Sequence, residues 1–364
     1  MIEYDQLAKV NAPQAKEMEQ AFRRVLNQGW FILGAEVAAF EKEFAAWCGA
    51  KHCVGVASGL DAITLALRAC HLPAGSEVLV PSNAYIASVL AVLEAELVPV
   101  LVEPDLRTYN MDPQAAARAI TPKTRAILPV HLYGKISDME SLSQLARRHG
   151  LQIVEDCAQA HGAAQNGRRA GTWGEAGAFS FYPTKNLGAL GDAGAIVTPR
   201  EDLAEEVRTL RNYGSEKKYH NELLGVNSRL DELQAALLRV KLPHLAEANR
   251  KKQSLAEIYF QKLKLAELIL PHRDPAFQDV FHIFAVRHPR RDALREHLLK
   301  EGVKTEIHYP VPPARQKALQ GKLGGGPFPL ADLIHATELS LPISTFHEVE
   351  EIREVCQAVN SFRG

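Results

Sequence analysis

Between residues 50 and 200, short apolar runs of strand length alternate with patterns of helical period. The apolar runs cover residues 53–57, 77–80, 98–102, 126–130, 153–155, 178–181 and 195–197. Helical patterns at 62–69, 86–94 and 139–148 separate the earlier runs. This order predicts an α/β fold with a mainly parallel sheet that helices cover on both faces. Ligands of such sheets bind beyond the carboxyl ends of the strands, so the residues after each run are candidates for a site.

The length of the chain predicts more than one hydrophobic core. Its 364 residues exceed the size at which a single core stops growing. A long helical pattern runs from Leu230 past Arg250, and Pro243 is expected to kink it or to mark a boundary. We therefore predict a large domain over residues 1–245 and a smaller α+β domain over residues 246–364, bridged by this helical segment.

Other elements are expected outside the sheet region. Helices are predicted at 14–28 and 36–48, each followed by a glycine that can end it, and later at 292–300 and 349–359. Strands are predicted at 280–286 and 303–307. The second domain is therefore expected to combine helices with a few strands.

The charges and cysteines exclude several classes of protein. The 42 Lys and Arg against 43 Asp and Glu give no one-sided field for nucleic acid or an anionic membrane. Five cysteines without a CxxC pair or metal spacing suit a reducing compartment and no structural metal. The N-terminus lacks the apolar stretch of a signal peptide. We expect a cytoplasmic protein with no nucleic-acid partner and no membrane segment.

The turn after the first run is a candidate anion site. Ser58, Gly59 and Leu60 lie between the run 53–57 and the helix 62–69. Backbone N–H groups at such a turn, with the positive end of the helix dipole, suit a phosphate group. The alternative is that Ser58 or Asp61 only caps the helix.

Two other strand ends carry chemistry. Asp156 comes directly after the run 153–155. A carboxylate at this place could hold a pyridinium nitrogen protonated. A helix cap or a surface turn is the alternative. Lys185 follows the run 178–181 and enters a glycine-rich turn. In a partly desolvated pocket its pKa would fall and its amine would become a nucleophile toward an aldehyde. An exposed structural lysine is the alternative.

Taken in order, these loops resemble one family. The segments are SGLDA, EDCAQAHGA, FSFYPTKNLGALGDAGAIVT, RNYGSEKKYHNELLGVNSRLDELQAA and IHYP. This order resembles the DegT/DnrJ/EryC1/StrS sugar aminotransferases over nearly the whole chain. The resemblance implies a fold-type I aminotransferase architecture, with a smaller α+β C-terminal domain, and pyridoxal 5'-phosphate (PLP) as cofactor.

The resemblance also implies roles for the cofactor site. Lys185 would form the Schiff base with PLP and Asp156 would pair with the pyridine nitrogen. Gln159 would lie near the ring, and Ser180 would hold the phosphate with the Gly59-Leu60 turn.

Two further residues concern the cofactor ring and a second subunit. Tyr85 occupies the place where the family stacks an aromatic side chain on the ring; a core aromatic is the alternative. The family works as a homodimer with shared sites, which implies that Asn227 reaches the phosphate of the partner's cofactor. Within one chain Asn227 would instead be the cap of the following helix.

Substrate contacts are the least determined part. The candidates at the sugar are Tyr182, His161, His308 and Tyr309, although a lone histidine is more often structural. Lys217, Lys218, Tyr219 and His220 are candidates for the nucleotide diphosphate, although lysines in polar loops are usually solvated.

The implied reaction transfers an amino group from L-glutamate to a keto group on a nucleotide-linked sugar. The long agreement through the RNYGSEKKY and IHYPVPP segments favours a dTDP-3-keto-6-deoxyhexose as substrate. A 4-keto nucleotide sugar stays open, and so does a PLP-binding regulator without turnover. A sugar dehydratase relative is disfavoured because Lys185 is present.

Overall fold

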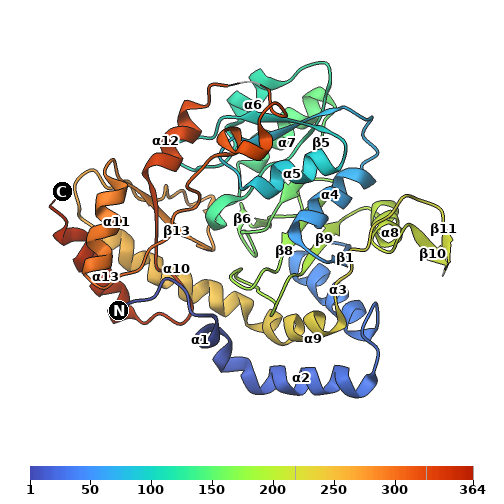
Figure 1. Cartoon of the computed structure of the whole chain (residues 1–364), viewed down its shortest axis with the longest axis horizontal. Coiled ribbons are helices and arrows are strands. Elements are labelled where there is room, and N and C mark those ends of the chain that lie inside the picture. The colour runs from blue at the N-terminus through green and yellow to red at the C-terminus, as the bar shows by residue number, and fades with distance from the viewer. Residues whose placement is uncertain (218, 325, 364) are drawn as a thin grey trace.

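The computed structural model describes residues 1–217, 219–324 and 326–363. Its centre is a seven-stranded sheet of order β1-β9-β8-β5-β4-β2-β3 (Figure 1). The strands are β1 (His52–Val56), β2 (Glu77–Pro81), β3 (Val98–Val102), β4 (Thr124–Ile127), β5 (Gln152–Asp156), β8 (Ala176–Ser180) and β9 (Gly194–Thr198). Only the pairings of β9 with β1 and β8 are antiparallel. The predicted mainly parallel mixed sheet is confirmed.

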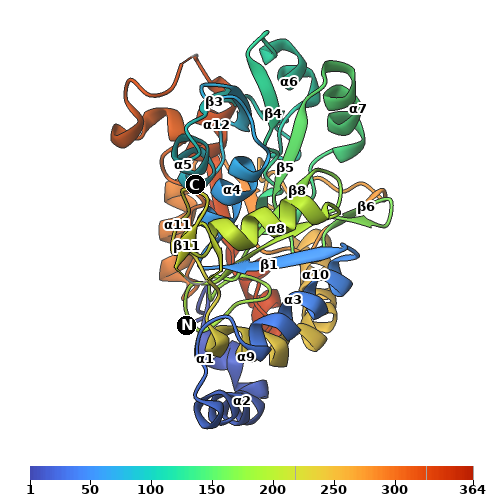
Figure 2. The same ribbon diagram turned by 90° about the vertical axis from the view of Figure 1, so that its right-hand side faces the viewer.

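Helices lie on both faces of the sheet and around its ends (Figures 1 and 2). Those of the first 241 residues are α1 (Leu7–Asn11), α2 (Ala15–Gln28), α3 (Ala35–Cys48), α4 (Gly59–Ala69), α5 (Ile86–Glu94), α6 (Pro113–Ala119), α7 (Met139–His149), α8 (Glu201–Leu210) and α9 (Glu232–Lys241). Short pairs are β6 (Ala164–Gln165) with β7 (Arg168–Arg169) and with β12 (Phe277–Gln278), and β10 (Ser215–Lys217) with β11 (His220–Asn221). Within the described chain, no helix has both the length and the apolarity to cross a membrane.

Successive strand residues point into two different apolar layers. In β2, Leu79 packs with α3 and α7, whereas Val78 and Val80 pack with α4 and α5 on the other face. In β9 the same alternation places Ile196 in the second layer. Because both faces are covered, the strands are apolar almost throughout, and this is the pattern on which the prediction rested.

A third apolar cluster gathers the C-terminal elements. These are α10 (Leu245–Lys262), β13 (Phe284–Arg287), α11 (Arg291–Lys300), β14 (Glu338–Leu341) and α13 (Val349–Ser361). Helix α12 (Pro329–Thr337) packs instead on the second apolar layer of the sheet. Leu245 belongs to the first sheet layer, while Leu255 and the rest of α10 belong to the third cluster. Helix α10 therefore spans both regions, and Pro243 lies in the short 3-10 turn before it. The domain division after residue 245 stays a prediction.

Two predicted strands are wrong in extent. Of the strand expected at 280–286, only Phe284 onward pairs in a sheet; Val280 and Ile283 instead donate backbone hydrogen bonds to Gly134 and Tyr133. The strand expected at 303–307 is reduced to isolated bridges of Val303 with Ile2 and of Glu306 with Ser340. In both cases a distant loop takes the hydrogen bonds that a neighbouring strand would have used.

Candidate active site

A cavity of about 400 Å³ opens at the carboxyl ends of the parallel strands. It brings together most of the residues that the sequence singled out, from five separate segments. The predicted residues that line it are Ser58, Gly59, Leu60, Tyr85, Asp156, Gln159, Ser180, Tyr182, Lys185, His308 and Tyr309. The cavity therefore lies where doubly covered parallel sheets bind their ligands.

Asp156 is the last residue of β5 and is only 5% exposed. Its Oδ2 accepts a hydrogen bond from the Ser88 hydroxyl at 2.7 Å, and its Oδ1 accepts one from the backbone N–H of Ala158 at 3.1 Å. Both contacts fix the direction of the carboxyl group. A carboxylate held in this way can bind a protonated ring nitrogen.

Lys185 follows β8 across the cavity and is fixed at its backbone by an N–H···O bond to Tyr182 of 2.8 Å. Exclusion of water lowers the pKa of its amine to about 8, while the charge of Asp156 opposes that shift. A sizeable share of the amine is therefore neutral near neutral pH, and the neutral form is the nucleophile.

The start of α4 forms a cradle for an anion. The Ser58 hydroxyl accepts a hydrogen bond from the N–H of Asp61 at 3.1 Å. Ser58 therefore caps α4, which was the alternative to an anion site in the sequence analysis. The N–H groups of Gly59 and Leu60 begin the helix, where no intrahelical acceptor exists. A Cβ at Gly59 would lie 2.5 Å from the Cβ of Ser180, so only glycine lets the turn approach β8 this closely.

Hydrogen bonds tie one wall of the cavity together. Gln159 accepts from the backbone N–H of Tyr133 at 2.6 Å and donates to the Tyr309 hydroxyl at 2.8 Å. The ring of Tyr309 lies 4.8 Å from that of Tyr85, centroid to centroid. Half of the Tyr85 side chain stays exposed to the cavity side, so its ring is available for stacking.

Some predicted residues lie elsewhere. His161, which the sequence analysis named as a candidate at the sugar, does not line the cavity. Its ring is fully buried between Phe179 and Phe181, outside the residues that line the cavity. The aromatic side chains of the segment that precedes Lys185 thus cover the His161 ring, and a substrate in the cavity cannot contact that ring. Burial, with the nearby charge of Lys185, lowers the pKa of His161 to about 3.

The residues assigned to a partner chain or to the nucleotide are not among those that line the cavity. Asn227 is exposed and forms an isolated backbone bridge with Asn212. It does not cap α9, because Asp231 holds the position before that helix. Lys217 and Tyr219 are exposed in the hairpin of β10 and β11, which projects from the body of the chain (Figure 1). Lys218 lies outside the described residues.

The sequence analysis missed several groups at the site. Ser88 and His282 line the cavity, and Thr184 and Asp192 flank Lys185 there. A second cavity of about 350 Å³ shares Lys185 and His308 with the first and is also lined by the N-terminal segment around Tyr4. Ser88 could have been found from its place one helical turn after Tyr85, whereas the N-terminal segment carries no local signal.

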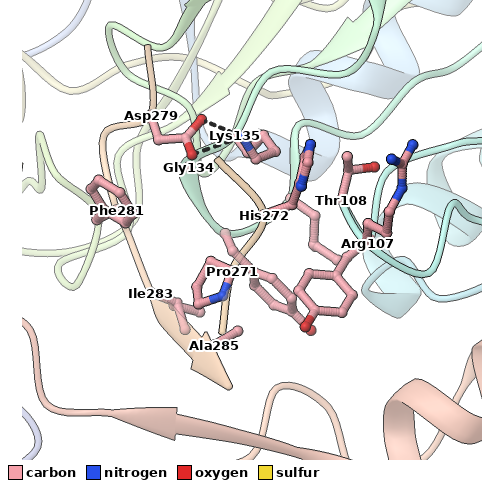
Figure 3. Close-up of a pocket in the computed structure, with 13 residues that line it drawn as sticks. Arg107, Thr108, Gly134, Lys135, Pro271, His272, Asp279, Phe281, Ile283 and Ala285 are labelled. Carbon is pink, nitrogen blue, oxygen red and sulfur yellow. Dashed lines mark hydrogen bonds and ion pairs between the residues drawn. The ribbon is translucent and has the colours of Figure 1, made fainter. Parts of the chain in front are cut away.

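Two other features are separate from this site. A separate small pocket lies where Lys135 pairs with Asp279, and His272 and Arg107 also line it (Figure 3). A buried cluster joins His131, Glu155 and Cys157. The Glu155 carboxylate already accepts hydrogen bonds from the N–H groups of residues 171, 173 and 174 and from the His131 ring. The cluster therefore fits a structural role, in which these hydrogen bonds hold the neighbouring loop in place.

Comparison with known proteins decides the family. A sequence model of the DegT/DnrJ/EryC1/StrS aminotransferase family matches residues 13–360. The chain belongs to this family. Among its relatives is a dTDP-3-amino-3,6-dideoxy-alpha-D-galactopyranose transaminase of Aneurinibacillus thermoaerophilus, 49% identical over 100% of this chain and 99% of the relative.

Solved structures of family members agree with the fold. DesV of Streptomyces venezuelae, solved with a ketimine intermediate, has a TM-score of 0.96 at 48% identity and covers 99% of this chain and 97% of its own. NtdA of Bacillus subtilis, solved with bound cofactor PMP, has a TM-score of 0.92 at 31% identity and covers 98% of this chain and 83% of its own. The predicted family, fold-type I architecture, aminotransferase class and PLP cofactor are thereby confirmed.

Proposed function

We propose that this family member transfers the amino group of L-glutamate to the keto group of dTDP-3-keto-6-deoxyhexose, giving dTDP-3-amino-3,6-dideoxyhexose. The observation that carries the proposal is that Lys185 and Asp156 line the same cavity. The chain that holds them is 49% identical to a dTDP-3-amino sugar transaminase. A dTDP-3-amino-3,4,6-trideoxy-alpha-D-glucose transaminase of Streptomyces venezuelae, also 49% identical, supports the third ring carbon.

The residues fit PLP in size and chemistry. The N–H groups of Gly59 and Leu60, with Ser180, offer donors to a phosphate. Asp156 would bind a protonated ring nitrogen, and Tyr85 and Gln159, which line the same cavity, would contact the ring. When bound, PLP supplies an aldehyde for amines and a ring that withdraws electrons from the carbon next to the amine.

The chain's own residues then divide the work. Asp156, held in place by Ser88 and the N–H of Ala158, would keep a proton on the ring nitrogen of the bound cofactor. Lys185 would hold the cofactor and, as a free amine, would take a proton from the alpha carbon of the donor. With the keto sugar, the same amine would give a proton back. Tyr182, His308 and Tyr309 line the space left for the sugar.

A homodimer with shared sites completes the proposal. The α2 region exposes large apolar side chains, among them Trp30 with 65% of its surface exposed. The others nearby in sequence are Phe22, Leu26, Phe31 and Ile32. Several large apolar side chains exposed in one short stretch of chain support a subunit interface there. We propose that Asn227 and the hairpin with Lys217 and Tyr219 extend to the partner's site.

The location and one alternative also belong here. We propose a cytoplasmic enzyme, since all five cysteines are unpaired. A regulatory role has some support, because a 39% identical relative from Geobacillus stearothermophilus is named a pleiotropic regulatory protein. The intact set of Lys185, Asp156, Gln159 and Ser180 at the cavity favours turnover instead.

The test is amino transfer by the purified protein with PLP and glutamate. We expect the 3-keto dTDP-sugar to be converted to its amino sugar, detected by mass, and the 4-keto isomer to react far more slowly. A Lys185→Ala protein is the control and should form no product. Faster conversion of the 4-keto isomer would contradict the assigned carbon, and binding of PLP without any turnover would favour the regulator.

A further inference from the structure

Strand β14 carries two buried polar residues that the reaction described above does not use. In its sequence ELSL, Glu338 and Ser340 point to one face, while Leu339 and Leu341 point into the third apolar cluster. Glu338 and Ser340 are both 0% exposed. Two buried polar side chains on one strand face need partners, and they find them in the loop that carries His308.

Two hydrogen bonds connect these residues to His308, and a third connects Ser340 to Glu338. Glu338 Oε2 accepts from the backbone N–H of His308 at 2.7 Å. Ser340 Oγ lies 2.5 Å from Glu338 Oε1 and 2.9 Å from Nδ1 of the His308 ring. Among the described residues no hydrogen bond reaches Nε2, and His308 lines both cavities that contain Lys185. The chain of contacts therefore runs from a buried carboxyl group to the cavity wall.

The single proton of the Ser340 hydroxyl makes the direction of this chain depend on Glu338. If Glu338 is ionised, Ser340 donates to it and accepts from Nδ1–H, so Nε2 presents a lone pair to the cavity. If Glu338 is protonated, its O–H donates to Ser340, which donates to Nδ1, so Nε2 carries the proton. The protonation of Glu338 thus sets the tautomer of His308.

The surroundings place the stored proton on Glu338. Burial raises the pKa of Glu338 to about 8, against the lowering effect of Ser340, the His308 N–H and Arg291. Burial and the charge of Lys185 lower the pKa of His308 to about 4, so the ring is neutral near neutral pH. Tyr4 also faces this cluster, and its hydroxyl is a further hydrogen-bond partner of Ser340. The other titratable or charged groups that face the cluster are Tyr133, His282, Glu306, Arg287 and Tyr309.

We infer that Glu338, Ser340 and His308 form a proton relay that ends at Nε2 in the cavity. This rests on the proposed amino transfer, in which the keto oxygen of the sugar leaves as water and needs a proton. The Nε2–H bond breaks as an O–H bond forms on that oxygen; the Ser340 proton moves to Nδ1 and the Glu338 proton moves to Ser340. The relay goes from neutral to singly negative, and a proton released by the reacting amine restores it.

Glu338 and Ser340 act as positioning residues, because they act through His308. The Glu338→Gln variant tests this sharply. Its amide oxygen can still accept the His308 N–H, and its NH₂ group donates to Ser340 as the protonated acid does. The variant keeps the neutral hydrogen-bond pattern and loses only the proton that the relay can release.

The first measurement is ¹⁵N NMR of histidine-labelled protein without cofactor, with the His308 signal assigned from His308→Gln. We expect the His308 proton to move from Nε2 to Nδ1 as pH rises through about 8 in the wild type. In Glu338→Gln it should stay on Nε2 at every pH, and Ser340→Ala should uncouple the ring from Glu338. A wild-type ring whose tautomer is independent of pH, or one unchanged by Glu338→Gln, would overturn the relay.

The second measurement is the pH dependence of amination by the holoenzyme. Glu338→Gln should lower kcat by about 10- to 100-fold, within the range of general acid catalysis, and remove the loss of rate near pH 8. Ser340→Thr keeps a hydroxyl and should recover the wild-type profile. Leu339→Val, on the other strand face, controls for a packing defect and should keep that profile.

These outcomes separate the relay from the function. If the His308 tautomer changes with pH but the protein aminates no sugar, the relay is supported and the proposed function is refuted. An active Glu338→Gln protein with the wild-type pH profile would refute the relay and leave the function.

Discussion

At the scale of single residues, the site depends on how Lys185 is kept partly free of its proton. Its pKa is lowered to about 8 by loss of contact with water, and Asp156 limits the shift. Lys252, in the adjoining cavity, is a matched comparison, because burial lowers its pKa to about 8 as well. Its amine is hydrogen-bonded to Asn186 at 3.1 Å and to the carbonyl of His282 at 3.3 Å. A lowered pKa alone therefore does not select the reactive lysine.

This gives a prediction about cofactor capture. The rate at which protein without cofactor captures PLP should rise with pH up to about 8 and then level off, because only the neutral amine of Lys185 reacts. Borohydride reduction and peptide mass should place the label on Lys185, also in a Lys252→Gln protein. A label on Lys252, or a rate that falls as pH rises from 6 to 8, would contradict the assignment.

Several site residues were accessible to sequence reasoning because strand ends determine them. Asp156 and Ser180 each end a strand whose apolar run is visible in the sequence. His161 sits in an equally suggestive segment, but its side chain points into the aromatic layer with Phe179 and Phe181. Glu338 and Ser340 could not have been found, because their partner His308 is 30 residues away on another loop.

At the scale of elements, the close approach of α4 to β8 shapes the anion cradle. A methyl group at Gly59 would meet the side chain of Ser180 at 2.5 Å, although Gly59 itself has helical geometry and no unusual φ. The constraint is therefore contact between two elements and not backbone conformation.

We expect Gly59→Ala to push α4 away from β8 and to weaken PLP binding at least 10-fold, because the phosphate donors would be displaced. Overpacking of this kind typically costs about 1–3 kcal/mol of stability, which thermal unfolding would record. Gly29→Ala is a poor control, since Gly29 has a φ of +66°; Gly324→Ala, with open space around its Cβ, is the matched one. Unchanged PLP affinity in Gly59→Ala would refute the cradle.

Element prediction failed where long-range contacts replaced sheet pairing. The parallel strands repeat one local pattern, apolar run then helix, and each was located to within a few residues. The segment at 280–286 alternates like a strand, yet its first half bonds to the Tyr133 turn, more than 140 residues away along the chain. No local periodicity records which distant turn will accept a hydrogen bond.

At the scale of the whole molecule, the described chain leaves Asn227 and the β10–β11 hairpin without a role in its own cavity. Together with the exposed apolar side chains around Trp30, this arrangement is what the shared-site dimer requires. The adjacent Ser228 instead contacts the first turn of α4 in its own chain, since its hydroxyl donates to Asp61 at 2.7 Å. One segment would thus support both sites of a dimer.

Mixing two inactive proteins tests this arrangement. Asn227→Asp should repel the partner's cofactor phosphate, and Lys185→Ala removes the anchor in its own chain. Each alone should be inactive, but unfolded and refolded together they should regain about a quarter of wild-type activity, because half of the random dimers contain one intact site of two. If mixing restores nothing while dimers form, Asn227 does not reach the partner.

The central claim is that Lys185 and Asp156 make this cavity an aminotransferase site, and one absorbance titration tests it most directly. Protein loaded with PLP should absorb near roughly 410 nm and, on addition of L-glutamate, shift toward roughly 330 nm as the amino group is taken up. Lys185→Ala should lack this turnover at any glutamate concentration. A wild-type spectrum that glutamate leaves unchanged would contradict the account, because the amino-donor half of the reaction would then be absent.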